Sequence, residues 1–254
     1  MPSLARSRTP RRARGFALVV VAAATGAGSV AAGAGASASA ATASSVLLAA
    51  KAAIAKQVSV HLVITSKSGS RSSVESVIAD LGKKSGREVI SQGKATVTVE
   101  VTPASGYMGG NSSGLTTIFG LSATDAKKLG GRWASFKPST SQYPNLRSAT
   151  TIGAVTGVLP PAKGTRLSIE SVKGTKTTKA TRLYLLAWTT AATSSSPKLA
   201  NKLTVDAVGA ALPVEETTTA SSGSEVAKFS KWGERVVVRA PRAGSAIAYS
   251  KIIG

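Results

Sequence analysis

The chain has 254 residues, with 32 Lys and Arg against 11 Asp and Glu, one His and no Cys, so its formal net charge is +21. A hydrophobic content of 43% with 17% charged residues excludes a chain that its own charge keeps disordered, and the length is enough to bury a core. Without cysteine there is no disulfide, thiolate metal ligand or thiol nucleophile, and a single histidine excludes a His-rich metal site.

The first forty residues have the composition of an export signal. Five arginines and no acidic residue precede an apolar run from Phe16 to about Ala34, and small-residue triplets of the A-x-A type follow at 36–43. These are the parts of a secretory signal peptide. We expect 1–40 to be a signal peptide and 41–254 to be one domain, secreted or held in the extracytoplasmic cell envelope.

The alternative for this segment is a membrane anchor that is never cleaved. Glycines and alanines dilute the apolar run, which makes it a weak spanning helix and favours cleavage. No cysteine follows the run, so a lipid anchor on a cysteine is chemically impossible. Cleavage after Ala40 removes five of the 32 basic residues and no acidic one, which leaves a net charge of +16.

After this segment the pattern predicts one helix and then many strands. Ser44 or Ser45 is placed to cap a helix over about 46–56. Alternation of apolar and polar residues predicts strands near 58–65, 94–101, 166–170 and 203–207, each with one covered and one wet face. The run from Leu183 to Trp188 is apolar at every position and predicts a central strand covered on both sides.

Two short helices are expected within the strand-rich part. Ser122 and Asp125 form a capping box, and Gly130 is placed to end that helix. A weaker helix is expected over 149–159, stopped by two prolines. The predicted class is therefore α+β, with helices gathered on the apolar face of one sheet.

Residues that resemble catalytic motifs lack the partners that catalysis requires. The segment 110–114 reads G-x-S-x-G, but its serine, Ser112, needs a histidine that follows it, and the single histidine, His61, precedes it on a predicted strand. We interpret 110–114 as a turn and His61 as a solvated strand residue. Two S-x-x-K matches, at 91–94 and 195–198, lack the companion motifs of their enzyme class and are interpreted as loops.

Carboxylates give no better case for catalysis. Glu215 and Glu216 are the adjacent pair, and neighbours on a strand point to opposite faces, so they cannot act together on one bond. We expect no enzyme, no metal and no cofactor. The positive charge favours anionic lipid headgroups or wall polymers as partners, and a 4% aromatic content argues against nucleic acid.

The order of elements resembles a known family. An N-terminal amphipathic helix precedes "VSVHLVIT", followed by "ATVTVEV", "GYMGG", "LSATDAKKLGGRW" and a closing "FSKWGERVVVRAP". This is similar to actinobacterial exported proteins related to LolA- and LppX-type lipid and lipoprotein carriers. The resemblance implies a strongly curved antiparallel β half-barrel whose concave apolar face wraps a few helices, with a hydrophobic cavity for acyl chains. Many members are lipoproteins, from which this chain departs because it has no cysteine.

A curved sheet covered by short, alanine-rich helices also leaves apolar space that a lipid tail can enter. The candidate lining residues are Val97, Val99, Val101, Phe119, Leu121, Leu129, Trp133, Leu183 and Leu185. For each residue, ordinary core packing is the alternative. The leading hypothesis is an exported, non-enzymatic carrier or sensor that holds a lipid or acyl chain. The second is an envelope module that binds a protein partner or an anionic wall polymer through its basic surface.

Overall fold

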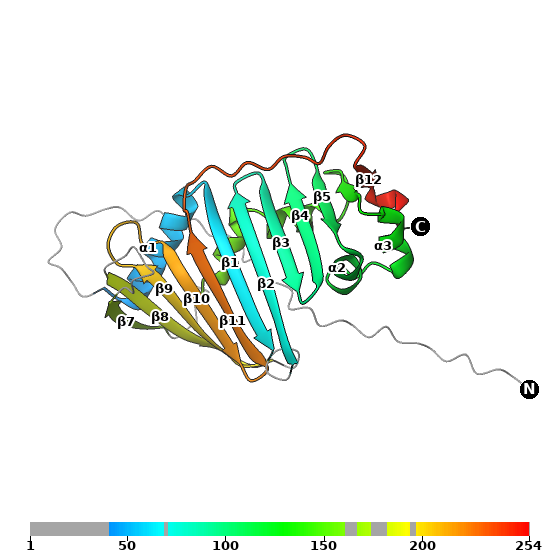
Figure 1. Ribbon diagram of the computed structural model, residues 1–254. Helices are drawn as coiled ribbons and strands as arrows, with labels where there is room; N and C mark the ends of the chain where they lie inside the picture. Colours follow the sequence, from blue (N-terminus) through cyan, green and yellow to red (C-terminus); the bar gives the residue numbers. More distant parts are fainter. Residues whose placement is uncertain (1–40, 69–70, 161–166, 174–181, 194–196, 254) are drawn as a thin grey trace, which may run out of the picture.

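The computed structural model of the protein describes residues 41–68, 71–160, 167–173, 182–193 and 197–253. In this part of the chain the strands form a single open sheet in the order β12-β6-β5-β4-β3-β2-β1-β11-β10-β9-β8-β7 (Figure 1). Every neighbouring pair is antiparallel except β12 with β6. The predicted α+β class is confirmed. The expected signal peptide lies outside the described residues.

The sheet has twelve strands of three to twelve residues. They are β1 (Ser59–Ser68), β2 (Arg71–Gly82), β3 (Gly86–Gln92), β4 (Ala95–Val101), β5 (Gly106–Gly110), β6 (Trp133–Phe136), β7 (Ser168–Lys173), β8 (Arg182–Thr190), β9 (Leu199–Asp206), β10 (Pro213–Ala220), β11 (Gly223–Ser230) and β12 (Ala246–Ala248). The helices of the described residues are α1 (Ala43–Lys56), α2 (Ser112–Thr117), α3 (Ala123–Leu129), α4 (Tyr143–Ala149) and the 3₁₀ helices η1 (Ile152–Val158) and η2 (Tyr249–Lys251).

The strand register divides the side chains between two faces. On β1, Leu62 lies opposite Ala79 of β2 and Phe229 of β11, so these three share one face. We call it the covered face, because side chains from the helices pack on it, and we call the other the outer face. The predicted alternation is clearest on β4, where every second residue is buried, beginning with Ala95.

Two apolar clusters lie on the covered face. The first packs α1 and η1 against β1, β2, β8, β9 and β11, with Ile54, Leu62 and Leu203 among its buried members. The second packs α2, α3 and α4 against β4–β6, with Met108 and Phe136 fully buried. The two clusters therefore meet the sheet on either side of β3.

The N-terminal helix begins earlier than the sequence predicts. Thr42, not Ser44 or Ser45, is the N-cap: its hydroxyl accepts from the Ser45 backbone N–H, and the Ser45 hydroxyl accepts from the Thr42 N–H. Serine takes the place of the usual Glu in this capping box, which a search for S-x-x-E does not find. The helix predicted after Ser122 is confirmed as α3, with Asp125 in its first turn and Gly130 in the left-handed conformation.

The helix predicted over 149–159 is two shorter elements. Residues 143–149 form α4, and 152–158 form the 3₁₀ helix η1, which contains Gly153 and Gly157. Glycine lowers α-helix stability by up to about 1 kcal/mol per residue, which accounts for the break in the α-helix. The turn expected at 110–114 is also wrong, because Asn111 caps α2 by accepting from the Gly114 N–H at 2.7 Å.

The strand β8 lies one strand in from the β7 edge, not at the centre of the sheet. Leu186 and Trp188 of this strand are buried in the first cluster, and Leu183 is buried on the outer face. The prediction of a central strand covered on both sides is thus wrong, because the strand lies near the edge and on its outer face only Leu183 is buried, while Leu185 and Ala187 are partly exposed. In the described part of the chain, no helix is long and apolar enough to cross a membrane.

Candidate functional site

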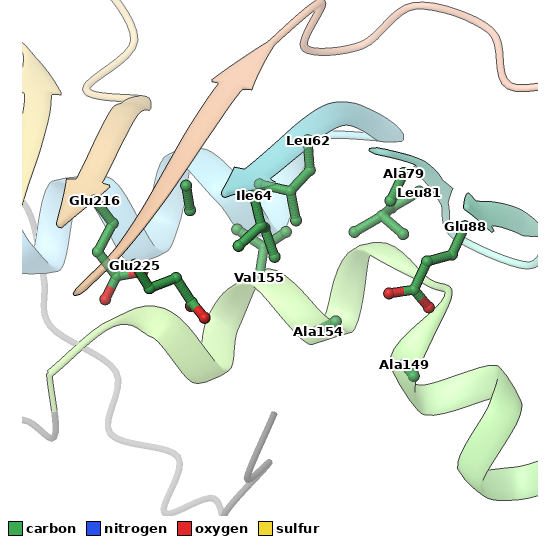
Figure 2. Close-up of a pocket in the computed structure, with 11 residues that line it drawn as sticks. Leu62, Ile64, Ala79, Leu81, Glu88, Ala149, Ala154, Val155, Glu216 and Glu225 are labelled. Atoms are coloured by element: carbon green, nitrogen blue, oxygen red, sulfur yellow. The ribbon is translucent and has the colours of Figure 1, made fainter. Parts of the chain in front are cut away.

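The covered face holds a cavity between the sheet and η1. Its floor is formed by Leu62 and Ile64 of β1, Ala79 of β2 and Ala227 of β11, and its roof by Ala154 and Val155 of η1, with Ala149 at one end (Figure 2). Its volume is about 30 Å³. Each enclosed water needs roughly 10–15 Å³ measured in this way, so the space admits about two waters.

Two close approaches fix where η1 meets the sheet. A Cβ on Gly86 of β3 would overlap the backbone carbonyl of Thr150, and Gly82 of β2 forms a parallel bridge with Thr151. The chain that links α4 to η1 therefore lies directly on β2 and β3, and glycine at 86 is needed for this contact. At the far end of η1, the Lys51 ammonium of α1 donates to the Pro160 carbonyl at 3.2 Å.

Carboxylates also reach this mainly apolar space. Glu88 of β3, Glu216 of β10 and Glu225 of β11 line the cavity, and in Figure 2 Glu216 and Glu225 lie together at one end with Glu88 at the other. Glu75 of β2 shares their face, since it alternates with Val77 and Ala79. Among the described residues, Glu225 accepts a hydrogen bond from the Ser66 hydroxyl at 2.9 Å.

Burial raises the pKa of three of these carboxyl groups. Desolvation, with a smaller contribution from the charge of Glu75, raises the pKa of Glu88 to about 7. Desolvation, with a smaller contribution from Glu225, raises the pKa of Glu216 to about 8. The pKa of Glu75 is raised by the same two causes, burial first and Glu225 second. The site thus carries titratable groups that change charge near neutral pH.

The structure brings together six of the nine predicted lining residues. Val97, Val99 and Val101 of β4, Leu121 just before α3 and Leu129 at its end are buried in the second cluster, and the half-buried Phe119 packs against it. These six are closely packed core side chains between β4 and the helices α2 and α3. None of them is among the residues that line the cavity under η1.

The other three predicted residues lie on the outer face. The Trp133 ring lies over Gly109. Trp133 is on the outer face because the next residue of the strand, Ala134, belongs to the second cluster on the covered face. Leu183 and Leu185 alternate with Leu186, which belongs to the first cluster. One apolar run can supply both faces of a strand, and sequence alone does not show which set faces the helices.

Sequence reasoning missed the residues that do line the cavity. Leu62 and Ile64 belong to a predicted strand and were available from its alternation. Glu88 and Glu216 had a further signal, since each occupies an apolar-face position of its strand.

The prediction that Glu215 and Glu216 point to opposite faces is confirmed, with the Glu215 carboxylate 4.0 Å from the Lys228 ammonium on the outer face.

The catalytic motif residues are not assembled into a site. Ser112 begins α2, which packs on the covered face, whereas His61 lies on the outer face. The His61 Nδ1 is 2.7 Å from Asp80 Oδ1 of the neighbouring strand. Among the described residues, no group of three or more His, Asp or Glu side chains is arranged to hold a metal ion.

A second, wider depression lies on the outer face beside His61 and Asp80. Its volume is about 270 Å³, and residues 231 and 234–238, from the segment that follows β11, form one wall. Arg87, Lys231 and Arg235 supply cationic groups, and Glu234 an anionic one. The Arg87 Nε donates to Glu100 Oε1 at 3.2 Å, which uses part of that positive charge.

The fold is shared with a solved structure. LprF from Mycobacterium bovis is 19% identical, with a TM-score of 0.50 over 78% of this chain and 96% of that one. The lipoprotein LppX from Mycobacterium tuberculosis is 16% identical, with a TM-score of 0.46 over 78% of this chain and 98% of that one. No protein-family model matches the chain, and no curated protein matches its sequence. The resemblance predicted from element order is thus confirmed as a likeness of fold.

Proposed function

We propose that residues 41–254 form one extracytoplasmic, non-enzymatic binding domain that holds a lipid or acyl chain between the covered face and η1. In this proposal residues 1–40 are a signal peptide removed on export, and the sheet curves as a half-barrel around the helices. The observation that carries the proposal is the cavity enclosed by Leu62, Ile64, Ala79 and Val155. An apolar space with few polar groups is the usual form of a small-molecule site.

The cavity accepts a chain only after η1 moves away from the sheet, because about 30 Å³ is far less than an acyl chain occupies. Contacts at Thr150, Thr151 and Pro160 hold the two ends of η1, but the helix between them is weakly built, which favours such movement. It is a seven-residue 3₁₀ helix whose N-terminus has no side-chain cap, and runs of this kind longer than about four residues are uncommon. Its two glycines further weaken it. We propose that η1 is the movable cover of the site.

A neutral ligand tests this function without involving charge. Dodecanol, titrated below its solubility limit into the secreted protein and followed by native mass spectrometry, is expected to form a one-to-one complex. Val155→Ala enlarges the space and is expected to tighten binding about threefold, because more of the chain is buried. Ala79→Phe fills the floor and is expected to weaken binding about tenfold.

Ile78→Phe is the matched control for Ala79→Phe. Ile78 is the neighbouring residue on β2, 47% exposed on the outer face, so the same ring there leaves the cavity unchanged. Dodecanol affinity equal in Ala79→Phe and Ile78→Phe would contradict the proposed site. So would a failure of both the wild type and Val155→Ala to bind dodecanol.

The outer depression favours a second candidate function, the binding of an anionic wall polymer. Arg87, Lys231 and Arg235 are the observation behind it. Retention of the protein on a polyphosphate column is then expected to fall steeply with salt and to weaken in a Lys231→Ala/Arg235→Ala variant. Lys202→Ala, an outer-face change on β9, is the control. Equal elution of the two variants would reject this candidate.

A further inference from the structure

The four carboxylates of the covered face form a series across five neighbouring strands. Glu88 is on β3, Glu75 on β2, Glu225 on β11 and Glu216 on β10, with Ser66 of β1 between Glu75 and Glu225. Ser66 is directly opposite both of these residues in the register. In the described part of the chain, no Lys, Arg or His forms an ion pair with any of the four. The covered face of a strongly basic chain thus carries a row of acids that have no ion-pair partner among the described residues, and Glu216 is the most buried of the four.

Glu216 distinguishes this line from an exposed acidic patch. Its side chain is directed into the cavity, next to Glu225 (Figure 2), and only 9% of the residue is exposed. Among the described residues it has neither a hydrogen bond nor an ion pair, and its cross-strand neighbours on this face are Leu203 and Ala227. Among the described residues every fully buried side-chain nitrogen or oxygen has a hydrogen-bond partner, so the carboxyl oxygens of Glu216 keep some access to water and a ligand can reach them. The burial of most of this side chain disfavours its charged form, which a cation beside it would stabilise.

The surroundings of Glu216 select the kind of cation. Hard metal ions take six or more oxygen ligands, whereas the wall beside Glu216 and Glu225 consists of Leu62, Ile64 and Val155. An alkylammonium ion meets both features. Its ammonium group donates to carboxylates, and its chain covers apolar carbon.

We propose that the ligand of this site is a long-chain amine, with its ammonium group between Glu216 and Glu225 and its chain extended under η1 toward Glu88. This inference rests on the proposed function and specifies its ligand class. The positive net charge of the chain attracts anions to the outside, whereas the covered face selects a cation. The surface charge therefore favours anionic partners, whereas the charge in the site favours a cationic ligand.

The test compares three twelve-carbon probes, each kept below its critical micelle concentration at pH 8.5. Dodecylammonium keeps its proton at this pH, as lysine does, and dodecanoate is anionic. By isothermal titration we expect dodecylammonium to bind about tenfold more tightly than dodecanol, with dodecanoate weakest, because a hydrogen bond to a charged group is stronger than a neutral one. Glu216→Gln is expected to remove this preference while retaining dodecanol binding.

Glu215→Gln is the matched control, since it makes the same change one residue away on the outer face. It should leave the preference for dodecylammonium intact. A second readout is proton uptake or release, measured at pH 7 in buffers of different ionisation enthalpy. Wild type should release protons on binding dodecylammonium, since the cation lowers the pKa of the carboxyl groups it meets, and Glu216→Gln should release fewer.

The outcomes separate this inference from the proposed function. Equal affinity for dodecylammonium and dodecanol, or a preference that survives Glu216→Gln, overturns the amine assignment and leaves the hydrophobic site standing. Failure to bind any of the three probes overturns the hydrophobic site and the amine assignment together. Tighter binding of dodecanoate than of dodecylammonium overturns the amine assignment and favours an anionic lipid.

Discussion

Glu88 and Glu216 reach the same cavity from strands that lie four positions apart in the sheet (Figure 2). At roughly 4.8 Å between neighbouring strands, their backbones are about 19 Å apart. The floor between them carries Leu62, Ile64 and Ala79. The lining residues are therefore drawn from a wide stretch of the sheet, with an acid near each end and an apolar middle. A site opened along this stretch by movement of η1 would match a chain-like ligand better than a compact one.

The stability of the free protein is expected to fall as the pH rises from about 5 to about 8. The folded-state pKa values of Glu88 and Glu216, about 7 and about 8, lie above the unfolded value of 4.5. The part of the folding free energy that comes from keeping these two carboxyl groups protonated is therefore fully present below pH 4.5, and it is lost as the pH rises through 7–8. Because one pKa unit corresponds to about 1.4 kcal/mol, we expect a loss of several kcal/mol over this range and a decrease in Tm of roughly 10 °C or more by scanning calorimetry.

Other charges near the cavity have to be separated from this effect. Glu75 and Glu225 share the face, and η1 contributes no titratable side chain. Of the helices beside η1, α1 carries Lys51, which binds the Pro160 carbonyl, and α4 carries Arg147 in its last turn. Glu216→Gln should flatten the profile, and Glu215→Gln should not. A wild-type Tm that is constant or rises from pH 5 to pH 8.5, or an equal slope in both variants, would contradict the assignment.

Elements with a strong local signal were predictable from the sequence. The alternation of β4 is visible in "ATVTVEV", and α3 is marked by Ser122, Asp125 and Gly130. The class of fold followed from counting such elements. The loss of the α-helix at 152–158 was foreseeable from Gly153 and Gly157, which the apolar pattern of that segment concealed.

The candidate site was not predictable in the same way, because it depends on register between distant strands. Glu88 and Glu216 are 128 positions apart in the chain, and no local pattern brings them together. Leu183 and Leu185 show the same limit, since a run that is apolar at every position leaves the choice of face open. The sequence did contain one usable signal, an acid at an apolar-face position of a strand.

Gly86→Ala is expected to destabilise the protein by about 2–3 kcal/mol, because the added methyl group overlaps the Thr150 carbonyl. Gly153→Ala is the control, since the nearest atom to its new methyl group is the Thr151 hydroxyl oxygen at 3.9 Å. Urea denaturation measures both. In hydrogen exchange, Gly86→Ala should lower protection around 149–152 first. Equal urea midpoints for Gly86→Ala and Gly153→Ala would show that the contact between Gly86 and the Thr150 carbonyl is not held tightly.

With export as proposed, the mature protein is expected to start at Ala41. Thr42 is the N-cap of α1, so cleavage after Ala40 leaves the capping box with Ser45 intact, whereas cleavage two residues later removes it. Intact-mass measurement of protein from the culture medium tests this directly. Loss of Thr42 should cost about 1 kcal/mol, as loss of other N-caps does. Protein that keeps residues 1–40 and stays with the membrane would instead support an uncleaved anchor.

Gly157→Ala is expected to slow the release of dodecanol if η1 covers the site. A methyl group there meets no atom within 4 Å, and alanine restricts the unfolded chain, so η1 gains about 0.4–1 kcal/mol. The open state of η1 becomes less populated by the corresponding factor, roughly two- to fivefold. The rate constant for dodecanol release, measured by stopped flow, should decrease by the same factor. Thr42→Ala, which weakens α1 at its cap, controls for a general change in stability and should leave the rate unaltered. A release rate that Gly157→Ala does not change would mean that the ligand leaves by a route that η1 does not control.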